Sequence, residues 1–220
     1  MPDIFLFDPA SAAVVLGGTA LATLARAGWR DLSVTMREAA ALARHRFDFA
    51  AARAALAGEV ENIRHNGVLC ARPVALSDSD LADCTAALTR HRSVAALIAQ
   101  HQQHRARRED RRARALVTLN EAAELSPVFG LVGTLVGLAQ LPATGLGDEG
   151  EVMAAVSTAI LTTLYGLLTA HLLILPLAGM IERRGRAEEE QREHLVQWLA
   201  QQVAPACPPA AVPIAPGIAA

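Results

Sequence analysis

Hydroxyl side chains at helical spacing are the groups in this sequence best suited to do chemistry. Four of them follow an i, i+4, i+7, i+11 pattern that places residues on one face of a helix: Thr158, Thr162, Tyr165 and Thr169. Thr163 lies beside that face, and Thr134 lies in a second apolar segment. A single threonine in an apolar helix usually bonds its own backbone carbonyl. A whole hydroxyl face has little reason to face lipid, so we expect it to line a polar path or contact a partner helix.

Hydroxyl groups alone do not carry a proton charge, and most proton relays in membranes use a carboxylate. Neither apolar segment contains an acidic residue. If ions pass along Thr134, Thr162, Thr163 and Tyr165, another chain must therefore supply the carboxylate. His171 is the titratable group deep in the second segment, where it serves either as a neutral, hydrogen-bonded structural group or directly in proton movement.

The elements that position these residues are two apolar stretches, residues 125–142 and 153–181, each long enough to cross a bilayer as a helix. The loop between them is acidic, with Asp148, Glu149 and Glu151, and arginines flank the pair on both sides. The positive-inside rule then places the flanks in the cytoplasm and the loop outside. A third crossing is predicted at residues 10–25, with Asp8 as N-cap and Pro9 at the first helical position. This places the N-terminus outside and the C-terminus in the cytoplasm.

The sequence therefore predicts an all-α, multi-pass membrane protein with three crossings and long helices that run from the membrane into the cytoplasm. The predicted domains are an N-terminal transmembrane helix (1–27), a cytoplasmic helical domain (28–124), a transmembrane hairpin (125–181), a cytoplasmic helix (182–203) and a disordered Pro/Ala-rich tail (204–220). Within the cytoplasmic domain, Gly58, Gly67 and Pro73 mark breaks. Ser77 and Asp80 predict a capping box, followed by a helix that runs almost without interruption from Ser79 into the membrane.

Composition excludes much enzyme chemistry. The sequence contains no lysine, which excludes a Walker lysine, a Schiff-base lysine and a lysine general base. No nucleophile–base pair, metal cluster or phosphate loop is present, so we expect no enzyme, no cofactor and no bound metal. His101 and His104 lie one turn apart but lack further ligands. The arginine run at residues 105–114 has no aromatic residues and reads as a cytosolic anchor, not as a nucleic-acid site.

Glycine and proline residues shape the two helices. Gly130, Gly133 and Gly137 form a small-residue stripe, and Gly166 lies on the second helix, as expected for close helix packing in lipid. Pro127 and Pro176 are predicted to kink their helices, as packing features or as hinges.

A resemblance to the MotA/TolQ/ExbB proton channel family lies in three stretches: residues 126–138 (SPVFGLVGTLVGL), residues 153–156 (MAAV) with 161–166 (LTTLYG), and residues 175–178 (LPLA). Residues 8–11 (DPAS) with 16–19 (LGGT) resemble the flagellar stator branch, MotA and PomA. By position, Thr134 and Thr163 match the family's pore-facing threonines. Stator subunits have four crossings, and this chain begins where their second would begin.

The resemblance implies a bacterial inner-membrane complex in which five copies surround two copies of a MotB-, TolR- or ExbD-like chain, whose single membrane helix supplies an Asp. The transported ion would be a proton, or sodium. We therefore expect a MotA-like stator subunit for motility that engages a rotor. A TolQ/ExbB-like energiser of a TonB- or TolA-like protein and a non-conducting scaffold are the alternatives. Two departures bear on this choice: residues 49–58 carry Arg53 but no Glu before Glu59, and His171 stands where an Asn is expected.

Overall fold

The structure, a computed structural model, describes residues 8–44, 47–66, 78–139 and 149–207. Over these ranges all the regular elements are helices: α1 (Pro9–Leu42), α2 (Phe49–Asn66), α3 (Ser79–His91), α4 (Val94–Ala139), α5 (Glu149–Leu168), the π-helix η2 (Thr169–Ile174), α6 (Leu175–Val203) and the 3-10 turn η3 (Ala204–Ala206). Three helical stretches are long and apolar enough to cross a membrane: Pro9–Leu42, Val94–Ala139 and Val152–Val203. The predicted all-α fold with three membrane-spanning helices is confirmed.

The helices fall into two compact units. The membrane unit comprises residues 1–44 and 110–184, and the bundle unit comprises residues 45–109 and 185–220. These boundaries cut the long helices α4 and α6, so the units differ from the domains that we predicted along the sequence. Of the predicted tail, residues 204–206 form η3, and residues 208–220 lie outside the described residues.

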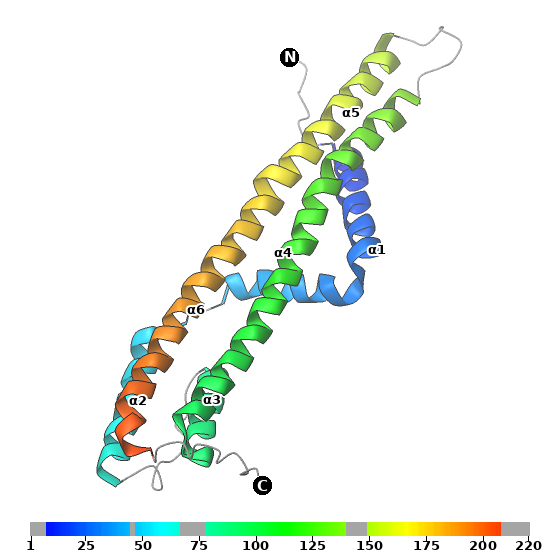
Figure 1. The fold of residues 1–220 in the computed structure, drawn as a ribbon. Helices are drawn as coiled ribbons and strands as arrows, with labels where there is room; N and C mark the ends of the chain where they lie inside the picture. Colours follow the sequence, from blue (N-terminus) through cyan, green and yellow to red (C-terminus); the bar gives the residue numbers. More distant parts are fainter. Residues whose placement is uncertain (1–7, 45–46, 67–77, 140–148, 208–220) are drawn as a thin grey trace, which may run out of the picture. The chain divides into compact units, whose positions relative to one another are not determined.

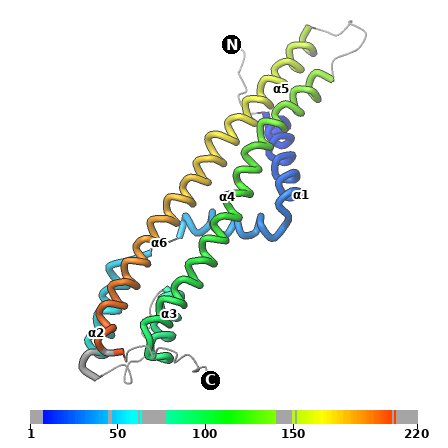
Figure 2. The backbone as a smooth tube through the Cα atoms, in the orientation of Figure 1, coloured from blue at the N-terminus to red at the C-terminus, as the bar shows by residue number. Residues whose placement is uncertain are grey.

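Helix α1 begins as its sequence predicts. Asp8 is the N-cap, and its side chain accepts hydrogen bonds from the backbone N–H groups of Ala10 and Ser11, while Pro9 occupies the first turn. The helix does not continue straight. Gly28 has φ 77° and ψ 165°, a conformation that only glycine adopts readily, and the chain turns sharply there (Figures 1 and 2). The predicted crossing therefore ends at a backbone break.

Helices α4 and α5 form the membrane hairpin. Pro127 lies inside α4, which continues through it to Ala139. The second arm passes from α5 through the π-helix into α6, where Leu175 N–H donates to the carbonyl of Ala170, five residues earlier. A proline lacks the N–H of a regular helix and crowds the preceding turn. We attribute the wider π turn to Pro176, which follows it directly.

The bundle unit has an apolar core from four helices. Its buried residues include Leu56 and Val60 of α2, Leu88 of α3, Leu97 of α4 and Leu195 of α6. Burial of such side chains is the main favourable term in folding. Gly58 lies within α2, so the predicted break there is wrong, and Gly67 and Pro73 lie outside the described residues.

Two further expectations in the bundle unit are wrong. The cap of α3 is Asp78, which directly precedes Ser79 and whose side chain accepts from the N–H groups of Asp80 and Leu81; Ser77, the predicted cap, lies outside the described residues. The helix predicted to run almost without interruption from Ser79 into the membrane ends at Arg92, which has left-handed φ 50° and ψ 35°. A new helix starts after Ser93, a residue type favoured at helix starts, which was the sequence signal for this break.

Candidate functional site

An open groove of about 450 Å³ lies between α4 and α5 in the membrane unit. Its lining consists of two threonines among apolar side chains: Thr134, Leu138, Val156, Ala159, Ile160, Thr163, Leu164 and Leu167. The structure thus brings together two of the predicted ion-path residues, Thr134 from the first arm of the hairpin and Thr163 from the second. None of the lining side chains titrates.

Both groove hydroxyls are partly satisfied by their own helices. Thr134 Oγ1 donates to the carbonyl of Leu131 at 2.6 Å, and Thr163 Oγ1 donates to the carbonyl of Ala159 at 3.2 Å. Each hydroxyl proton is then engaged, while the oxygen keeps lone pairs that accept a hydrogen bond. The groove therefore offers two acceptors in an apolar wall, which suits a protonated acid or a cation that arrives from outside this chain.

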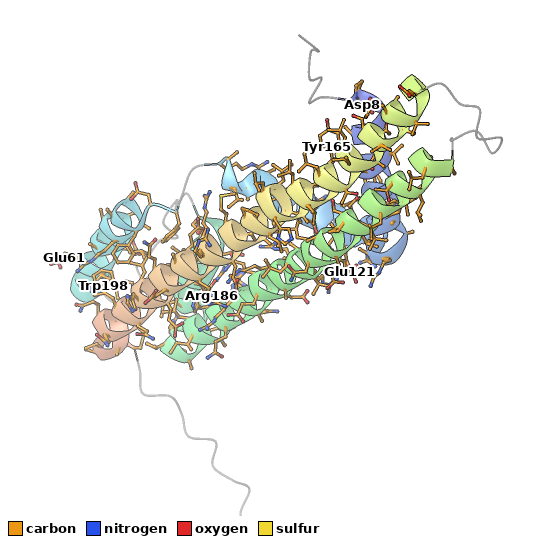
Figure 3. The ribbon with its side chains drawn as sticks, turned by 90° about the horizontal axis from the view of Figure 1, so that it is seen from above. Asp8, Glu61, Glu121, Tyr165, Arg186 and Trp198 are labelled. Atoms are coloured by element: carbon orange, nitrogen blue, oxygen red, sulfur yellow. The ribbon has the colours of Figure 1, made fainter. Side chains whose placement is uncertain are left out.

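The remaining predicted hydroxyls lie elsewhere. Thr162 is 2% exposed and lies against Gly133 of α4, and its hydroxyl donates to the carbonyl of Ala159 at 3.0 Å. The Tyr165 hydroxyl accepts the backbone N–H of Asp8 at 3.0 Å, so it contacts the start of α1 (Figure 3). Thr162 and Tyr165 of the predicted hydroxyl face thus pack against neighbouring helices. Of the hydroxyl residues of α5, Thr163 shares the groove with Thr134.

Close packing of α4 on α5 holds the groove in place. A Cβ on Gly130 would lie 3.0 Å from the Thr162 carbonyl oxygen, and a Cβ on Gly133 would lie 2.7 Å from the Thr162 side chain. A Cβ on Gly166 would lie 2.7 Å from the carbonyl oxygen of Ser126, whereas one on Gly137 would make only ordinary contacts, starting at 3.4 Å. Helices approach this closely only where no side chain intervenes.

A buried hydrogen bond joins the two helices at the same place. Ser126, which is fully buried, donates through its hydroxyl to the carbonyl of Gly166 at 3.0 Å. Pro127 follows Ser126 directly, and its Cα would lie 3.2 Å from a Cβ on Gly166. Pro127 therefore lies beside one of the close contacts of the hairpin.

His171 lies within the π-helix and is exposed on this chain, as is Pro176 just beyond it. It does not line the groove. Its side chain forms no hydrogen bond with the described residues, so the predicted role as a hydrogen-bonded structural group requires a partner outside this part of the chain.

Helix α1 contributes contacts that the sequence reasoning missed. A Cβ on Gly18 would clash with the ring of Phe129, so α1 packs on α4 through a glycine. Thr19 and Thr23 are also buried on α1, and the Thr23 hydroxyl donates to the carbonyl of Thr19 at 2.7 Å. The repeated small and hydroxyl residues of residues 11–23 were the available signal for a packed face.

The bundle unit contains a buried charge cluster centred on Arg108. Its guanidinium forms two hydrogen bonds to Glu189, at 2.8 and 2.9 Å, and also contacts Asp80. Burial alone would raise the pKa of Glu189, but the bonds from Arg108 hold this pKa below its usual value. His101 is buried 3.9 Å from Glu189, and burial lowers its pKa despite that carboxylate. The cluster ties α3, α4 and α6 together.

Cys84 lies in the core beside this cluster. Burial, aided by the charge of Asp80, raises the pKa of its thiol to about 12, so it is an unreactive core residue. Across the described ranges, no group of three or more His, Cys, Asp or Glu side chains is arranged to hold a metal ion.

Comparison with known proteins links this arrangement to a family. The profile described as "MotA/TolQ/ExbB proton channel family" matches residues 80–194, just over half of the chain. Motility protein A of Treponema pallidum (strain Nichols) is 33% identical over 89 residues, which are 40% of this chain and 34% of that protein. Chemotaxis protein PomA of Vibrio alginolyticus is 32% identical over 73 residues, 33% of this chain and 28% of that protein. The matches thus span about a third of the length of these curated relatives.

Two solved structures share the fold. One is described as the flagellar MotAB stator complex from Bacillus subtilis, with a TM-score of 0.79 and 18% identity over 92% of this chain and 81% of that chain. The other is C. jejuni MotAB, with a TM-score of 0.80 and 17% identity over 94% of this chain and 81% of that chain. At these identities the likeness concerns the fold.

Proposed function

Because this chain belongs to the MotA/TolQ/ExbB proton channel family, we propose that it is the channel subunit of a motor complex driven by the proton-motive force. In particular, we propose a MotA-like stator subunit that generates torque for motility. The relatives named motility protein A and the fold shared with MotAB stator complexes support this choice.

The observation that carries the proposal is the groove with its two threonines. Thr134 and Thr163 place hydroxyl oxygens on an otherwise apolar wall that has no carboxylate of its own. A path for protons needs a group that gains and loses charge, and in lipid an unpaired charge is costly. The groove therefore supplies half of an ion site, and a carboxylate from a second chain supplies the other half.

In this mechanism the partner's membrane helix brings its Asp to the groove. When the Asp is protonated, its O–H donates to a threonine oxygen whose own proton is already engaged. When the proton leaves, the charged carboxylate loses that bond and is repelled by the apolar wall. Gain and loss of the proton thus change where the partner helix binds most favourably, and the partner moves relative to the copies of this chain around it.

The assembly we propose is a ring of five copies around two copies of a MotB-like chain in the bacterial inner membrane. The N-terminus lies outside and the C-terminus in the cytoplasm, in keeping with the acidic loop and the arginine-rich flanks. The proton is the proposed ion.

Conservative substitutions in the groove test the proposal. Thr163→Val and Thr134→Val remove the acceptor oxygens and keep the side-chain shape, so each should abolish swimming and proton uptake by vesicles containing the chain and its partner. Thr162→Val is the matched control, because its hydroxyl is buried in the helix contact and does not line the groove. The complex should still be recovered intact for all three variants.

Full proton uptake by the Thr163→Val complex would refute the ion site. Absence of uptake in the intact wild-type complex would refute conduction and favour a scaffold. A TonB- or TolA-like protein recovered with the complex, in place of a rotor protein, would show that it energises envelope transport instead of motility.

A further inference from the structure

The part of α1 that follows the break at Gly28 forms a separate surface of the membrane unit. Residues 9–27 supply the apolar crossing, and residues 29–42 run on as a helix in a different direction (Figure 1). This second half therefore begins where the crossing ends, at the boundary between hydrocarbon and water.

One side of this helix is fixed to α4 by acidic residues. Asp31 lies 3.8 Å from Arg114, and Glu38 lies 3.7 Å from Arg111. Thr35, between them, is buried, and its hydroxyl donates to the carbonyl of Asp31 at 2.8 Å. These contacts decide which side of the helix remains open.

The open side carries apolar and basic residues in two adjacent stripes. Trp29 is 74% exposed and Met36 is 65% exposed, one heptad apart. At about 100° per residue, Ala40 lies within about 40° of both on the helix surface. Arg30 and Arg37 follow the same seven-residue spacing on the next stripe, are exposed, and form no ion pair among the described residues.

This arrangement fits the headgroup region of a bilayer. A tryptophan prefers the membrane interface because its ring is apolar and its N–H is polar. Arginine binds phosphate groups through its planar fork of donors, and basic residues beside a membrane attract anionic lipids. Acidic residues, which would repel such lipids, lie on the opposite side and are paired with α4.

We propose that the face formed by Trp29, Arg30, Met36 and Arg37 binds anionic lipid headgroups of the bilayer that α1 crosses. Lipid is the expected occupant because the face begins at Trp29, two residues after the crossing ends, so the bilayer surface is within its reach. The proposal needs only the membrane crossing of α1. It does not depend on ion conduction or on a partner chain.

Tryptophan fluorescence provides a direct test, since the sequence contains only Trp29 and Trp198. The full chain with Trp198→Phe is reconstituted into vesicles of phosphatidylcholine alone, or with one third phosphatidylglycerol. Trp29 should be quenched more by a spin label near the headgroup than by one deep in the acyl chains. Phosphatidylglycerol should strengthen this quenching about twofold, and high salt should reverse the gain.

Charge-matched variants distinguish lipid binding by this face from a general attraction between arginines and anionic lipids. Arg30→Gln with Arg37→Gln should remove the gain from phosphatidylglycerol. Arg90→Gln with Arg107→Gln, two exposed arginines of the bundle unit, should keep it. Equal loss in both double variants, or equal quenching in both vesicle types, would overturn the proposal.

The other occupant to distinguish is a second copy of this chain. The accessibility of Trp29 to a water-soluble quencher is therefore measured in lipid-free detergent while the chain is diluted. If dilution exposes Trp29, a second copy covers the face and the lipid proposal fails. If dilution leaves the accessibility unchanged and vesicles with phosphatidylglycerol shield Trp29 further, the proposal is supported.

Discussion

Gly166 is the position where one added methyl group should do most damage to the membrane hairpin. A Cβ there would lie 2.7 Å from the Ser126 carbonyl oxygen and 3.2 Å from the Cα atoms of Gly130 and Pro127. All three contacts are with backbone atoms, which do not rotate away as the end of a flexible side chain does. Ordinary contact starts at 3.4 Å, so α4 and α5 must separate by about 0.7 Å in the Gly166→Ala variant.

The separation has two costs. Overpacking of a well-packed contact costs about 1–3 kcal/mol. Lengthening of the bond from Ser126 Oγ to the Gly166 carbonyl, now 3.0 Å and buried, adds about 1 kcal/mol. We therefore expect Gly166→Ala to destabilise the hairpin by roughly 2–4 kcal/mol.

Two glycine variants serve as controls. Gly137→Ala creates only ordinary contacts, and Gly17→Ala meets no atom within 4 Å. The purified chain is heated in mild detergent, and the temperature at which half of the monodisperse protein is lost is measured by size exclusion. Gly166→Ala should lower this temperature by roughly 5–10 °C, and the controls should change it by less than about 2 °C. A midpoint for Gly166→Ala equal to that of Gly137→Ala would refute the close contact as a source of stability.

Three further changes test other parts of the fold. Gly28→Ala meets no atom within 4 Å but forces alanine into φ 77°, so it should cost about 1–3 kcal/mol in the same heating assay; an unchanged midpoint would show that the break is not required. Tyr165→Phe removes the acceptor for the Asp8 N–H and should cost about 1 kcal/mol, measured as faster proteolysis at the start of α1, and an unchanged rate would contradict this role. His101 has a lowered pKa in the fold, so the unfolded chain takes up its proton first, and stability should fall as the pH drops below about 6.5. In melting curves between pH 7.5 and 5.5, the His101→Gln variant should lose less stability than the wild type, and the variant of exposed His91, His91→Gln, should behave like the wild type. An equal loss in all three proteins would contradict the role given to His101.

The helices and their order in the membrane were predictable because they rest on local properties. The apolar stretches set the crossings, and Asp8 with Pro9 set the start of α1, since a cap needs only neighbouring residues. The glycines of the hairpin were also readable, because small residues at helical spacing indicate close packing in lipid.

The breaks in the helices were harder to predict from the sequence. Gly28 and Arg92 both adopt positive φ, yet nothing around Arg92 marks it as unusual for a helix interior except Ser93 after it. The π turn before Pro176 compensates for the N–H that a proline lacks. The sequence predicts a distortion of the helix there, but not that the distortion is a π turn.

By itself, the sequence determined the hydroxyl-rich, carboxylate-free character of the hairpin, because residue type and helical period are properties of the chain alone. Only the tertiary structure decided which hydroxyls share a surface. The close contact of α5 with Gly133 buries Thr162, and the Tyr165 hydroxyl bonds the Asp8 N–H at the start of α1. Thr134 and Thr163 are left in the groove because the angle and depth of helix contact, which depend on residues far apart in the sequence, set what each face meets.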